Sequence, residues 1–336
     1  MKLFLSHSNS GEVKGGVELY SSHLQKVFPD LKTLDYHSLK EEFGDTFIPL
    51  LREPWRAEQL GKKISKEFST AEILTNGMFS WNLMHKKQVN ICHGTYAEFA
   101  EKAVSKTNPD YYRLKYIYSA YEKKAANNAK IVVANSKNTA FNIKKHFGLD
   151  SKVIYPAVDF SEFILFEKEK AQNKLNWSGV NVIFVGRPEY AKGFDFIEQL
   201  ALKNPQIQFR CVLSRKYDSK IKNLHIIEPI AHSKLSLYYS AADIVLFPSR
   251  FEGFGFVTIE ALACNKKIIA LNTGVASEIF SENIFIAEPN IKSIQNKISM
   301  ALDSEETKSR NFIKNNFSFT RFEKEWLELD QLITDS

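Results

Sequence analysis

The sequence predicts an α/β protein made of two doubly wound domains, each with a parallel sheet covered by helices on both faces. The chain has 336 residues, which is too long for one typical hydrophobic core. Short apolar runs alternate with longer helical segments about six times in each half, which is the order of repeated βαβ units. Most of these runs are continuous in Val, Ile, Leu and Phe, as in strands that are buried on both faces.

These apolar runs are predicted to be strands. In chain order they are 2–7, 32–37, 71–75, 88–93, 130–135 and 152–156 in the first half, then 181–186, 207–213, 224–228, 243–247, 266–271 and 283–288. The boundary falls in 157–179, where charges mix without a strand pattern, so we predict domains at 1–158 and 159–316. A C-terminal helix over 317–336 follows, and we expect its apolar stripe to pack back on the first domain. The stripe is Phe319, Phe322, Trp326, Leu329 and Ile333.

The composition is that of an ordinary globular protein, with 44% hydrophobic and 25% charged residues. No apolar stretch approaches the roughly 18 residues of a membrane span, and the N-terminus turns polar too early for a secretory signal. Three cysteines, Cys92, Cys211 and Cys264, lie far apart in apolar runs. This pattern favours buried thiols in a reducing cytoplasm over a disulfide framework or a zinc site.

The positive charge is concentrated in the first half of the chain. Residues 1–150 hold 22 Lys and Arg against 16 Asp and Glu, whereas 151–336 hold 23 of each. One interpretation is an uneven solvated surface. The other is a first domain that meets an anionic partner, such as a phospholipid surface or a phosphorylated glycan; nucleic acid is not expected.

The segment 111–128 carries part of this charge on a predicted helix. It is either a core-packed helix with solvated charges or a surface that attracts an anionic membrane or a lipid-linked acceptor. Its apolar face is Tyr111, Leu114, Tyr118, Tyr121 and Ala125, and its charges are Arg113, Lys115, Lys123 and Lys124 against Glu122.

The stretch "PSRFEGFGFVTIEA" lies where a doubly wound sheet binds ligands, after the strand 243–247 and at the start of a helix. Gly253 and Gly255 let backbone amides approach an anionic or hydroxyl-rich ligand. Glu252 and Glu260 flank this turn, and a carboxylate can accept two adjacent sugar hydroxyls. The alternative is a helix N-terminal carboxylate that offsets the macrodipole by about 0.3–1 kcal/mol.

Two cations follow the first strand of the second half. Arg187 and Lys192 flank a turn, so they can place cationic groups where they would hold phosphate oxygens; alone, either would be read as a solvated surface cation. The chain contains no Asp-x-Asp pair. We therefore predict no metal site and no cofactor, with the two cations in the role of a metal.

Two further candidates lie in the first half. "GEVKGGVE" lacks the spacing of a Walker loop or of a dinucleotide fingerprint. Gly15 and Gly16 would let backbone amides approach a ligand, or would form a plain helix start. His93 ends a strand at "CHG", where a lone histidine is either a hydrogen-bonded structural residue or a site residue.

These segments together resemble glycosyltransferase family 4, the retaining family with the GT-B fold. "PSRFEGFGFVTIEALAC" resembles the family's E-x7-E signature, and "KGGVE", "VNICHG" and "VIFVGRPEYAKGFD" resemble three further family segments in the right order. The resemblance covers nearly the whole chain. It implies two Rossmann-like domains facing across a cleft, with the nucleotide-sugar donor on the second and the acceptor on the first.

The resemblance also implies roles for the candidate residues. Glu260 would hold the ribose hydroxyls, Glu252 the donor-sugar hydroxyls, and His93 the transferred sugar near its reacting face, so Glu252 and His93 are the expected catalytic residues. The other expected donor-binding residues are Gly15, Gly16, Arg187, Lys192, Ile230, Gly253, Phe254, Gly255 and Phe256.

The chain departs from the family pattern at several places. Asn265 and Lys267 replace a usual glycine and proline, 272–278 holds one glycine instead of two, and the loop expected to meet the base, around Ile230, lacks its common glycine. The E-x7-E pair stays intact. These changes leave the base and the sugar undetermined.

The expected activity is retaining transfer of a hexose-type sugar, with UDP the expected nucleotide. The acceptor would be a hydroxyl of a glycan or a lipid-linked molecule in cell-envelope polysaccharide or lipopolysaccharide synthesis. The expected place is the cytoplasm or the inner face of the cell membrane. The alternatives are a sugar phosphorylase or nucleotide-sugar epimerase on the same fold, or a catalytically silent nucleotide-sugar-binding subunit.

Overall fold

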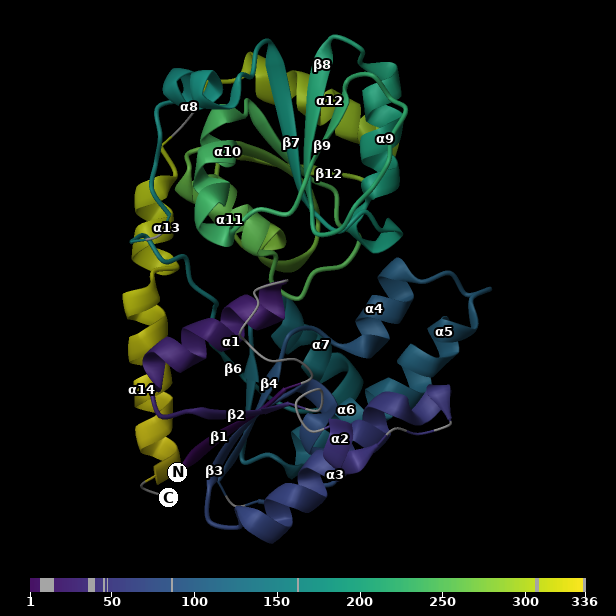
Figure 1. Cartoon of the computed structure of the whole chain (residues 1–336), viewed down its shortest axis with the longest axis vertical. Coiled ribbons are helices and arrows are strands. Elements are labelled where there is room, and N and C mark those ends of the chain that lie inside the picture. Colours follow the sequence, from purple (N-terminus) through teal and green to yellow (C-terminus); the bar gives the residue numbers. More distant parts are fainter. Residues whose placement is uncertain are drawn as a thin grey trace. The chain divides into compact units, whose positions relative to one another are not determined.

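The chain folds into two compact units (Figure 1). The computed structural model describes residues 1–6, 15–35, 40–44, 46, 48–85, 87–161, 163–305 and 308–334. Unit 1 is Met1–Pro156 with Phe322–Ser336, and unit 2 is Ala157–Arg321. The division thus falls after Pro156, and the last helix belongs to unit 1 by its contacts.

The observed elements of unit 1 alternate as the sequence predicts. They are β1 Lys2–Ser6, α1 Gly16–Val27, β2 Lys32–Asp35, α2 Lys40–Phe43, η1 Pro49–Leu51, α3 Arg52–Glu67, β3 Glu72–Asn76, η2 Gly77–Ser80, β4 Gln88–Cys92, α4 Tyr96–Ala103, α5 Pro109–Tyr112, η3 Arg113–Tyr118, α6 Ser119–Asn128, β5 Ile131–Ala134, α7 Lys137–Phe147, β6 Lys152–Val153 and α14 Phe319–Thr334. Each strand predicted in this half is confirmed, although β6 is shorter than 152–156.

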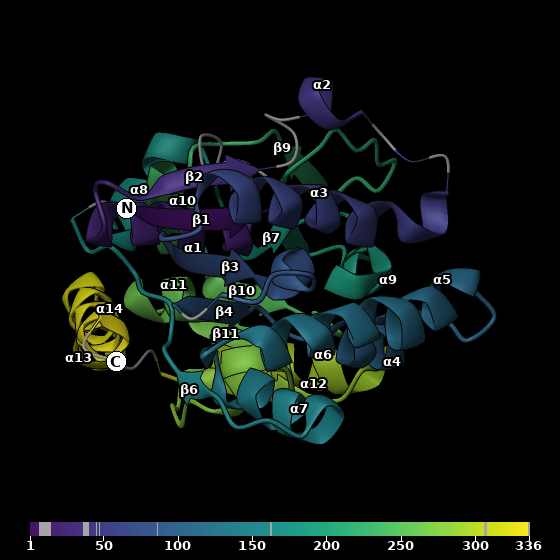
Figure 2. The ribbon, with the colours of Figure 1, turned by 90° about the horizontal axis from the view of Figure 1, so that it is seen from below.

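The described strands of unit 1 form one parallel sheet in the order β2-β1-β3-β4-β5-β6. Figure 2 shows β2, β1, β3 and β4 in this order from top to bottom. The chain runs outward from β1 to β2 and then returns to β3 on the other side of β1. The strand order therefore reverses between β1 and β3, and ligands of doubly wound sheets bind at the carboxyl ends of such strands.

The apolar stripe of α14 packs on unit 1, as expected. Phe322, Trp326, Leu329 and Ile333 are buried, and the ring of Tyr20 on α1 meets the rings of Phe322 and Trp326 edge-on. Figure 1 shows α14 alongside α1. The period of three and four residues buries one face of the helix against this surface.

Unit 2 repeats the alternation, and each strand predicted in this half is confirmed. Its elements are α8 Lys168–Leu175, β7 Val180–Gly186, η4 Tyr190–Lys192, α9 Phe194–Lys203, β8 Ile207–Leu213, β9 Leu224–Ile227, η5 His232–Lys234, α10 Leu235–Ala241, β10 Ile244–Phe247, α11 Phe256–Ala263, β11 Lys267–Leu271, η6 Gly274–Ser277, β12 Ile284–Ala287, α12 Ile291–Asp303 and α13 Arg310–Asn316.

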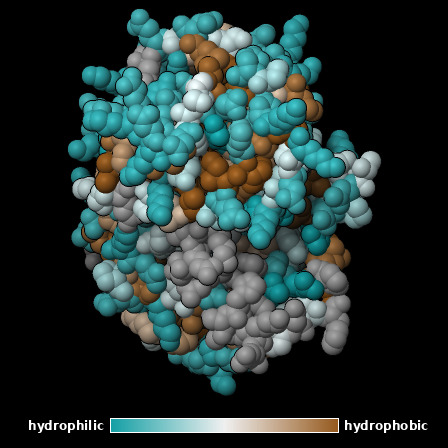
Figure 3. Space-filling view, turned by 45° about the horizontal axis from the view of Figure 1, so that its top comes forward, coloured by the Kyte–Doolittle hydropathy of each residue, from teal (hydrophilic) through white to brown (hydrophobic). Residues whose placement is uncertain are grey.

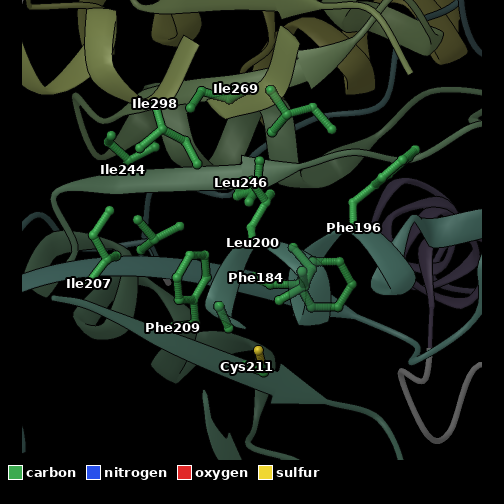
Figure 4. Close-up of a cluster of buried hydrophobic side chains, with 14 of the residues drawn as sticks. Phe184, Phe196, Leu200, Ile207, Phe209, Cys211, Ile244, Leu246, Ile269 and Ile298 are labelled. Carbon is green, nitrogen blue, oxygen red and sulfur yellow. The ribbon is translucent and has the colours of Figure 1, made fainter. Parts of the chain in front are cut away.

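The described strands of unit 2 are also parallel, in the order β12-β11-β10-β7-β8-β9. The strand order reverses between β7 and β10. Side chains from α9 and α12 pack on one face of this sheet, and Figure 4 shows Leu200 and Ile298 of these helices with Phe184, Phe209 and Leu246 of the strands. This apolar layer makes the strands rigid supports for the loops that follow them.

The polarity of the described surface and the burial of the cysteines are those expected from the sequence. The face in Figure 3 is mostly hydrophilic, with smaller apolar areas between the charged side chains. Cys92, Cys211 and Cys264 are buried free thiols, as predicted. Among the described residues, no helix has the length and apolar character to cross a membrane.

Candidate active site

The strongest candidate site lies where the strand order of unit 2 reverses. Strands β7 and β10 are adjacent and parallel, so the loops at their carboxyl ends lie side by side. These loops are 187–193 after β7 and 248–255 after β10. They meet in an ion pair, with Nζ of Lys192 2.6 Å from Oε1 of Glu252. The side chains of Lys192 and Glu252 are 23% and 11% exposed, so the pair is largely shielded and still reachable.

Gly193 allows this close approach of the two loops. Its φ of +71° is in the left-handed region, and a Cβ built there would lie 2.1 Å from the carbonyl oxygen of Pro248. Any side chain at position 193 would therefore push the two loops apart. The glycine of the "KG" segment thus places the preceding residue, Lys192, against Glu252.

Arg250 ties the same two loops together. Its guanidinium holds both oxygens of Asp195, with Nη1 to Oδ1 at 2.7 Å and Nη2 to Oδ2 at 2.8 Å. The guanidinium carbon also lies 3.7 Å from the ring centre of Tyr190 and 4.1 Å from that of Phe196. A planar fork that is bidentate and stacked is a well-defined anchor. Sequence reasoning missed Arg250, although both partners stand inside the motifs, in "PSRFEG" and "KGFD".

The glycine-rich turn leads from Glu252 into α11. Gly253, Phe254 and Gly255 are buried and Phe256 is half-buried, and Gly255 precedes the first residue of α11. The amide of Val275 donates to the carbonyl oxygen of Phe254 at 2.7 Å and braces the turn. The turn therefore leads into the amino end of a helix, a place that favours an anion.

One glycine suffices in the neighbouring 272–278 segment. A Cβ on Gly274 would lie 2.3 Å from the carbonyl oxygen of Phe254, and its φ is +53°. The glycine that the chain retains is therefore the one that the turn requires. The backbone also explains why asparagine can replace the usual family glycine at position 265. Asn265 has a φ of +57°, in the left-handed region, which asparagine tolerates better than most residues.

Glu260 is buried inside unit 2 and is held by two side chains. Nε2 of His232 lies 2.7 Å from its Oε1, and the hydroxyl of Tyr239 donates to its Oε2 at 2.8 Å. Burial, followed by the neighbouring Glu260, raises the pKa of Tyr239 well above its usual value, so Tyr239 remains a donor. Ile230 is half-buried two residues before His232 in the same loop. Sequence reasoning missed His232 and Tyr239, which no local pattern marks.

Arg187 has a different partner from the members of the Lys192–Glu252 pair. Its side chain is 56% exposed, and its Nε is 3.6 Å from Oε2 of Glu189. Arg215, at the end of the adjacent strand β8, approaches the other oxygen of Glu189 at 3.7 Å. One carboxylate thus faces two arginines, which leaves net positive charge at this edge of the sheet.

In unit 1, His93 follows β4 at the carboxyl edge of the sheet, next to the strand β3 at which the strand order reverses. Its Nε2 is 2.9 Å from Oδ1 of Asn76, whose amide donates to Oγ of Ser6 at 3.2 Å. Ser6, Asn76 and His93 come from the ends of β1, β3 and β4, and the ring of Tyr20 meets the imidazole edge-on at 4.8 Å. Burial lowers the pKa of His93 to about 4, so the ring is uncharged at neutral pH.

Gly15 and Gly16 lie at the amino end of α1. Gly15 precedes the helix and Gly16 is its first residue, and both are exposed. The preceding segment 7–14, including Lys14 of "KGGVE", lies outside the described residues. Over the part of the chain that the structure describes, no three His, Cys, Asp or Glu side chains are grouped as metal ligands.

Comparison with known proteins gives the class and then the family. Residues 17–162 match the family described as Glycosyltransferase Family 4, and residues 166–319 match Glycosyl transferases group 1. With two doubly wound units, these matches define a glycosyltransferase of the GT-B fold. The chain belongs to glycosyltransferase family 4.

Curated relatives are similar at low identity. The chain is 24% identical over 248 residues to an uncharacterized 41.2 kDa protein in the cps region of Klebsiella pneumoniae, covering 70% of this chain and 67% of that protein. It is 27% identical to the O-antigen chain mannosyltransferase RfbU of Salmonella typhimurium, covering 61% and 62%. For D-inositol 3-phosphate glycosyltransferase of Paenarthrobacter aurescens the identity is 27%, and the chain spans less than half, 45%, of its length.

Solved structures share the fold across the whole chain. Sucrose-phosphate synthase from Thermosynechococcus elongatus superposes with a TM-score of 0.80 at 18% identity and covers 99% of both chains. Anabaena Alr3699/HepE in complex with UDP and glucose gives a TM-score of 0.74 at 19% identity and covers 98% of both. These identities support the common fold.

Proposed function

We propose that this protein transfers a hexose-type sugar, with retention of configuration, from a UDP-sugar to a hydroxyl of a cell-envelope glycan or lipid-linked acceptor. The observation that carries the proposal is the Lys192–Glu252 pair beside the glycine turn, at the carboxyl edge where nucleotides bind in such sheets. The UDP and glucose bound by the Anabaena protein support the choice of donor. The Klebsiella and Salmonella relatives support an envelope glycan as acceptor.

The proposed roles follow from the placement of each group. Lys192, Arg187 and the amides of the turn hold the diphosphate, and Glu252 accepts hydroxyls of the donor sugar. The bond between the sugar C1 and the phosphate oxygen breaks while the acceptor oxygen bonds C1 on the same face. The acceptor proton passes to the leaving diphosphate, whose charge the cations stabilise. No protein nucleophile is needed in this step.

The remaining proposed contacts come from His93, Gly15 and Gly16 of unit 1 and from Ile230 of unit 2. His93 is an uncharged hydrogen-bonding group that contacts the transferred sugar, and Asn76 orients its ring. Gly15 and Gly16 offer amides at the amino end of α1 to the diphosphate or the acceptor. Ile230 contacts the nucleotide base. The proposed site of action is the cytoplasm, on the inner face of the membrane when the acceptor is lipid-linked.

A panel of nucleotide-sugars tests this function. UDP-sugars are expected to raise the melting temperature more than GDP- or ADP-sugars, because only ligands that bind the folded state stabilise it. The stabilising donor is then incubated with envelope glycans, and NMR of the product reports the anomeric configuration. Conversion of UDP-sugars without any acceptor would favour an epimerase, and an inverted product would contradict the retaining step.

The same assay with EDTA tests the proposed absence of a metal. Turnover is expected to persist after chelation, because Lys192 and Arg187 carry the charge that a cation would otherwise supply. Complete loss of activity with recovery on adding Mn²⁺ would contradict this part of the proposal.

The proposed membrane contact rests on the charges of segment 111–128, because its apolar face is packed in the core. Segment 109–128 is not one regular helix but α5, the π-helical turn η3, and α6. Its predicted apolar face is packed in the core of unit 1, with Tyr111, Leu114 and Tyr118 in one buried cluster. Arg113 pairs with Asp110 and Lys115 with Glu101. The apolar face of this segment is therefore packed in the core, as one of the two interpretations of the sequence expected, and is not available to a membrane.

Other residues of the segment remain exposed. Tyr112 and Tyr116 are 55% and 61% exposed with stacked rings, and Lys123 and Lys124 are exposed on α6. Glu122, the one acid of 111–128, is buried, and burial raises its pKa to about 8. It is therefore mostly uncharged at pH 7 and offsets little of the lysine charge.

Liposome binding tests this surface. Binding to anionic vesicles is expected to exceed binding to neutral vesicles and to fall with salt, because each surface lysine contributes about 1 kcal/mol within a Debye length. Changing Lys123 and Lys124 to Glu should abolish the preference, whereas Lys170→Glu on α8 of unit 2 should not. Equal partitioning to both vesicle types would favour a soluble acceptor.

A further inference from the structure

The buried carboxylate of Glu260 is fixed by three elements of unit 2. Glu260 is on α11, the Tyr239 hydroxyl comes from α10, and His232 is on η5, after the carboxyl end of β9. The ring of Phe163 lies 5.8 Å from the imidazole of His232 and 6.1 Å from the ring of Tyr239. Among the described residues, each oxygen of the carboxylate therefore has one side-chain partner, and the group cannot rotate without breaking one of these contacts.

Exposure decides which of these groups a ligand meets. The side chain of Glu260 is 4% exposed and that of His232 is 25% exposed, while Tyr239 is fully buried. A ligand that approaches Glu260 from solvent therefore meets the imidazole of His232 beside Oε1. The short turn η5 holds the imidazole there, since the amide of Lys234 donates to the carbonyl oxygen of Ala231 at 2.9 Å.

The number of lone pairs on the Glu260 carboxylate that no protein group uses shows how many further hydrogen bonds it can accept. A carboxylate has about four lone-pair sites, two on each oxygen. Tyr239 uses one site on Oε2, and His232 uses one on Oε1 when its Nε2 carries the proton, which is the tautomer that a carboxylate partner favours. One site then remains on each oxygen. Two fixed acceptors side by side match two hydroxyls on adjacent carbons.

We propose that His232 is a specificity-determining residue that, by holding Oε1 of Glu260, selects nucleotides with an intact ribose diol. This inference rests on the proposed function, in which Glu260 binds the ribose. His232 lies two residues after Ile230, the proposed contact of the base, so one short loop sets both the base contact and the diol receptor. A nucleotide that lacks one hydroxyl leaves one of the two acceptors unpaired in a shielded position, which binding penalises.

Calorimetry with UDP, GDP and ADP identifies the nucleoside diphosphate that binds best, and its 2′-deoxy and 3′-deoxy forms are then compared with it. The unchanged protein is expected to bind the ribonucleotide roughly 10-fold or more tightly than either deoxy form. In His232→Ala this ratio should fall toward one, because the ribonucleotide loses more affinity than the deoxy forms. His232→Gln, which keeps an N–H donor, should restore much of the ratio.

Two further variants complete the experiment. Glu260→Gln should also lose the discrimination. His225→Ala is the matched control, because His225 on β9 contacts Gln208 at 2.7 Å and belongs to the same unit; its ratio should stay unchanged. Circular dichroism and thermal melting establish that each variant is folded. A merely structural histidine would lower the melting temperature and leave the ratio as it was.

The outcomes separate this inference from the proposed function. If no nucleoside diphosphate binds the unchanged protein, the proposed function is wrong and this inference falls with it. If ribose discrimination is present and is lost in Glu260→Gln but kept in His232→Ala, the function stands and the role of His232 is refuted. If the unchanged protein binds all forms equally, the diol receptor itself is refuted.

Discussion

Replacing Glu252 with Gln is expected to lower kcat by roughly 100-fold while the donor KM changes little. Glu252 is the carboxylate beside the transferred sugar, and its charge also holds Lys192 at 2.6 Å. Loss of the charge weakens the hydrogen bonds from the sugar hydroxyls to Glu252 and the ion pair that positions Lys192. We expect these interactions to be stronger in the transition state, and removal of one such group typically costs about 10²–10³ in kcat. Steady-state kinetics with the best donor measures both constants.

Comparison with two other variants makes this result specific. Glu260→Gln should instead raise KM more than it lowers kcat, because ribose contacts exist in the ground and transition states alike. Glu167→Gln is the control, since Glu167 forms an exposed ion pair with Lys170 at 2.8 Å on unit 2 and should change neither constant. The reverse ranking of Glu252 and Glu260 would mean that their roles are exchanged.

The proposed role of Lys192 in binding phosphate is tested by measuring the affinity of the protein for the free nucleoside diphosphate. Lys192→Ala should weaken it by about 1.5–3 kcal/mol, the usual loss for a charge-assisted phosphate contact. Arg187→Ala should act in the same direction. Because Arg187 is 56% exposed, solvent screens its contribution and the loss should be smaller. Unchanged calorimetric affinity in both variants would remove these cations from the site.

Replacing Arg250 with Ala is expected to have the second large effect, on stability and on affinity together. The change removes the bidentate bond to Asp195 and the stacking on Tyr190 and Phe196, a loss of about 2–3 kcal/mol. It also frees the loop that carries Lys192, so the affinity for the nucleoside diphosphate should fall. Arg250→Lys should not restore either property, because an ammonium group cannot form the planar fork.

A double-mutant comparison shows whether Arg250 acts through Lys192. In the Lys192→Ala background, Arg250→Ala should cause little further loss of diphosphate affinity, because the positioned group is already absent. Arg210→Ala is the matched control. Arg210 stacks on Trp177 at 5.0 Å and bonds Asn181 at 2.9 Å on the same sheet, so its loss should lower stability and leave affinity intact. Full additivity of Arg250 and Lys192 would show that Arg250 has a purely structural role.

Local pattern was enough to predict the strands and the strand-to-turn motifs. Continuous apolar runs marked most of the described strands, since a strand buried on both faces needs apolar side chains on both. The stripe of the terminal helix predicted the face that packs on unit 1, because the helical period alone decides which residues share a face. Glu252 and Glu260, on either side of the glycine turn, indicated a ligand site because these residues also lie close together in the chain.

Segment 109–128 shows where local pattern fell short. Its apolar face was visible in the sequence, but the same pattern fits a face on a membrane and a face in a core. The structure buries Tyr111, Leu114 and Tyr118 and interrupts the helix with a π-helical turn. Burial of Glu122 and the raised pKa of its carboxyl follow from the same packing.

The sequence by itself determined the fold class, the family resemblance and the loops that carry the site, because each depends on residues close together in the chain. The tertiary structure decided the partners: Lys192 with Glu252, Arg250 with Asp195, and Glu260 with His232 and Tyr239. These residues are 21 to 60 positions apart. The strand order places β7 beside β10, which brings Lys192 to Glu252 and Arg250 to Asp195. The packing of α10 and η5 on α11 brings Tyr239 and His232 to Glu260. Hydrogen bonds and ion pairs act over a few ångströms, so only the folded arrangement of the elements fixes which groups meet.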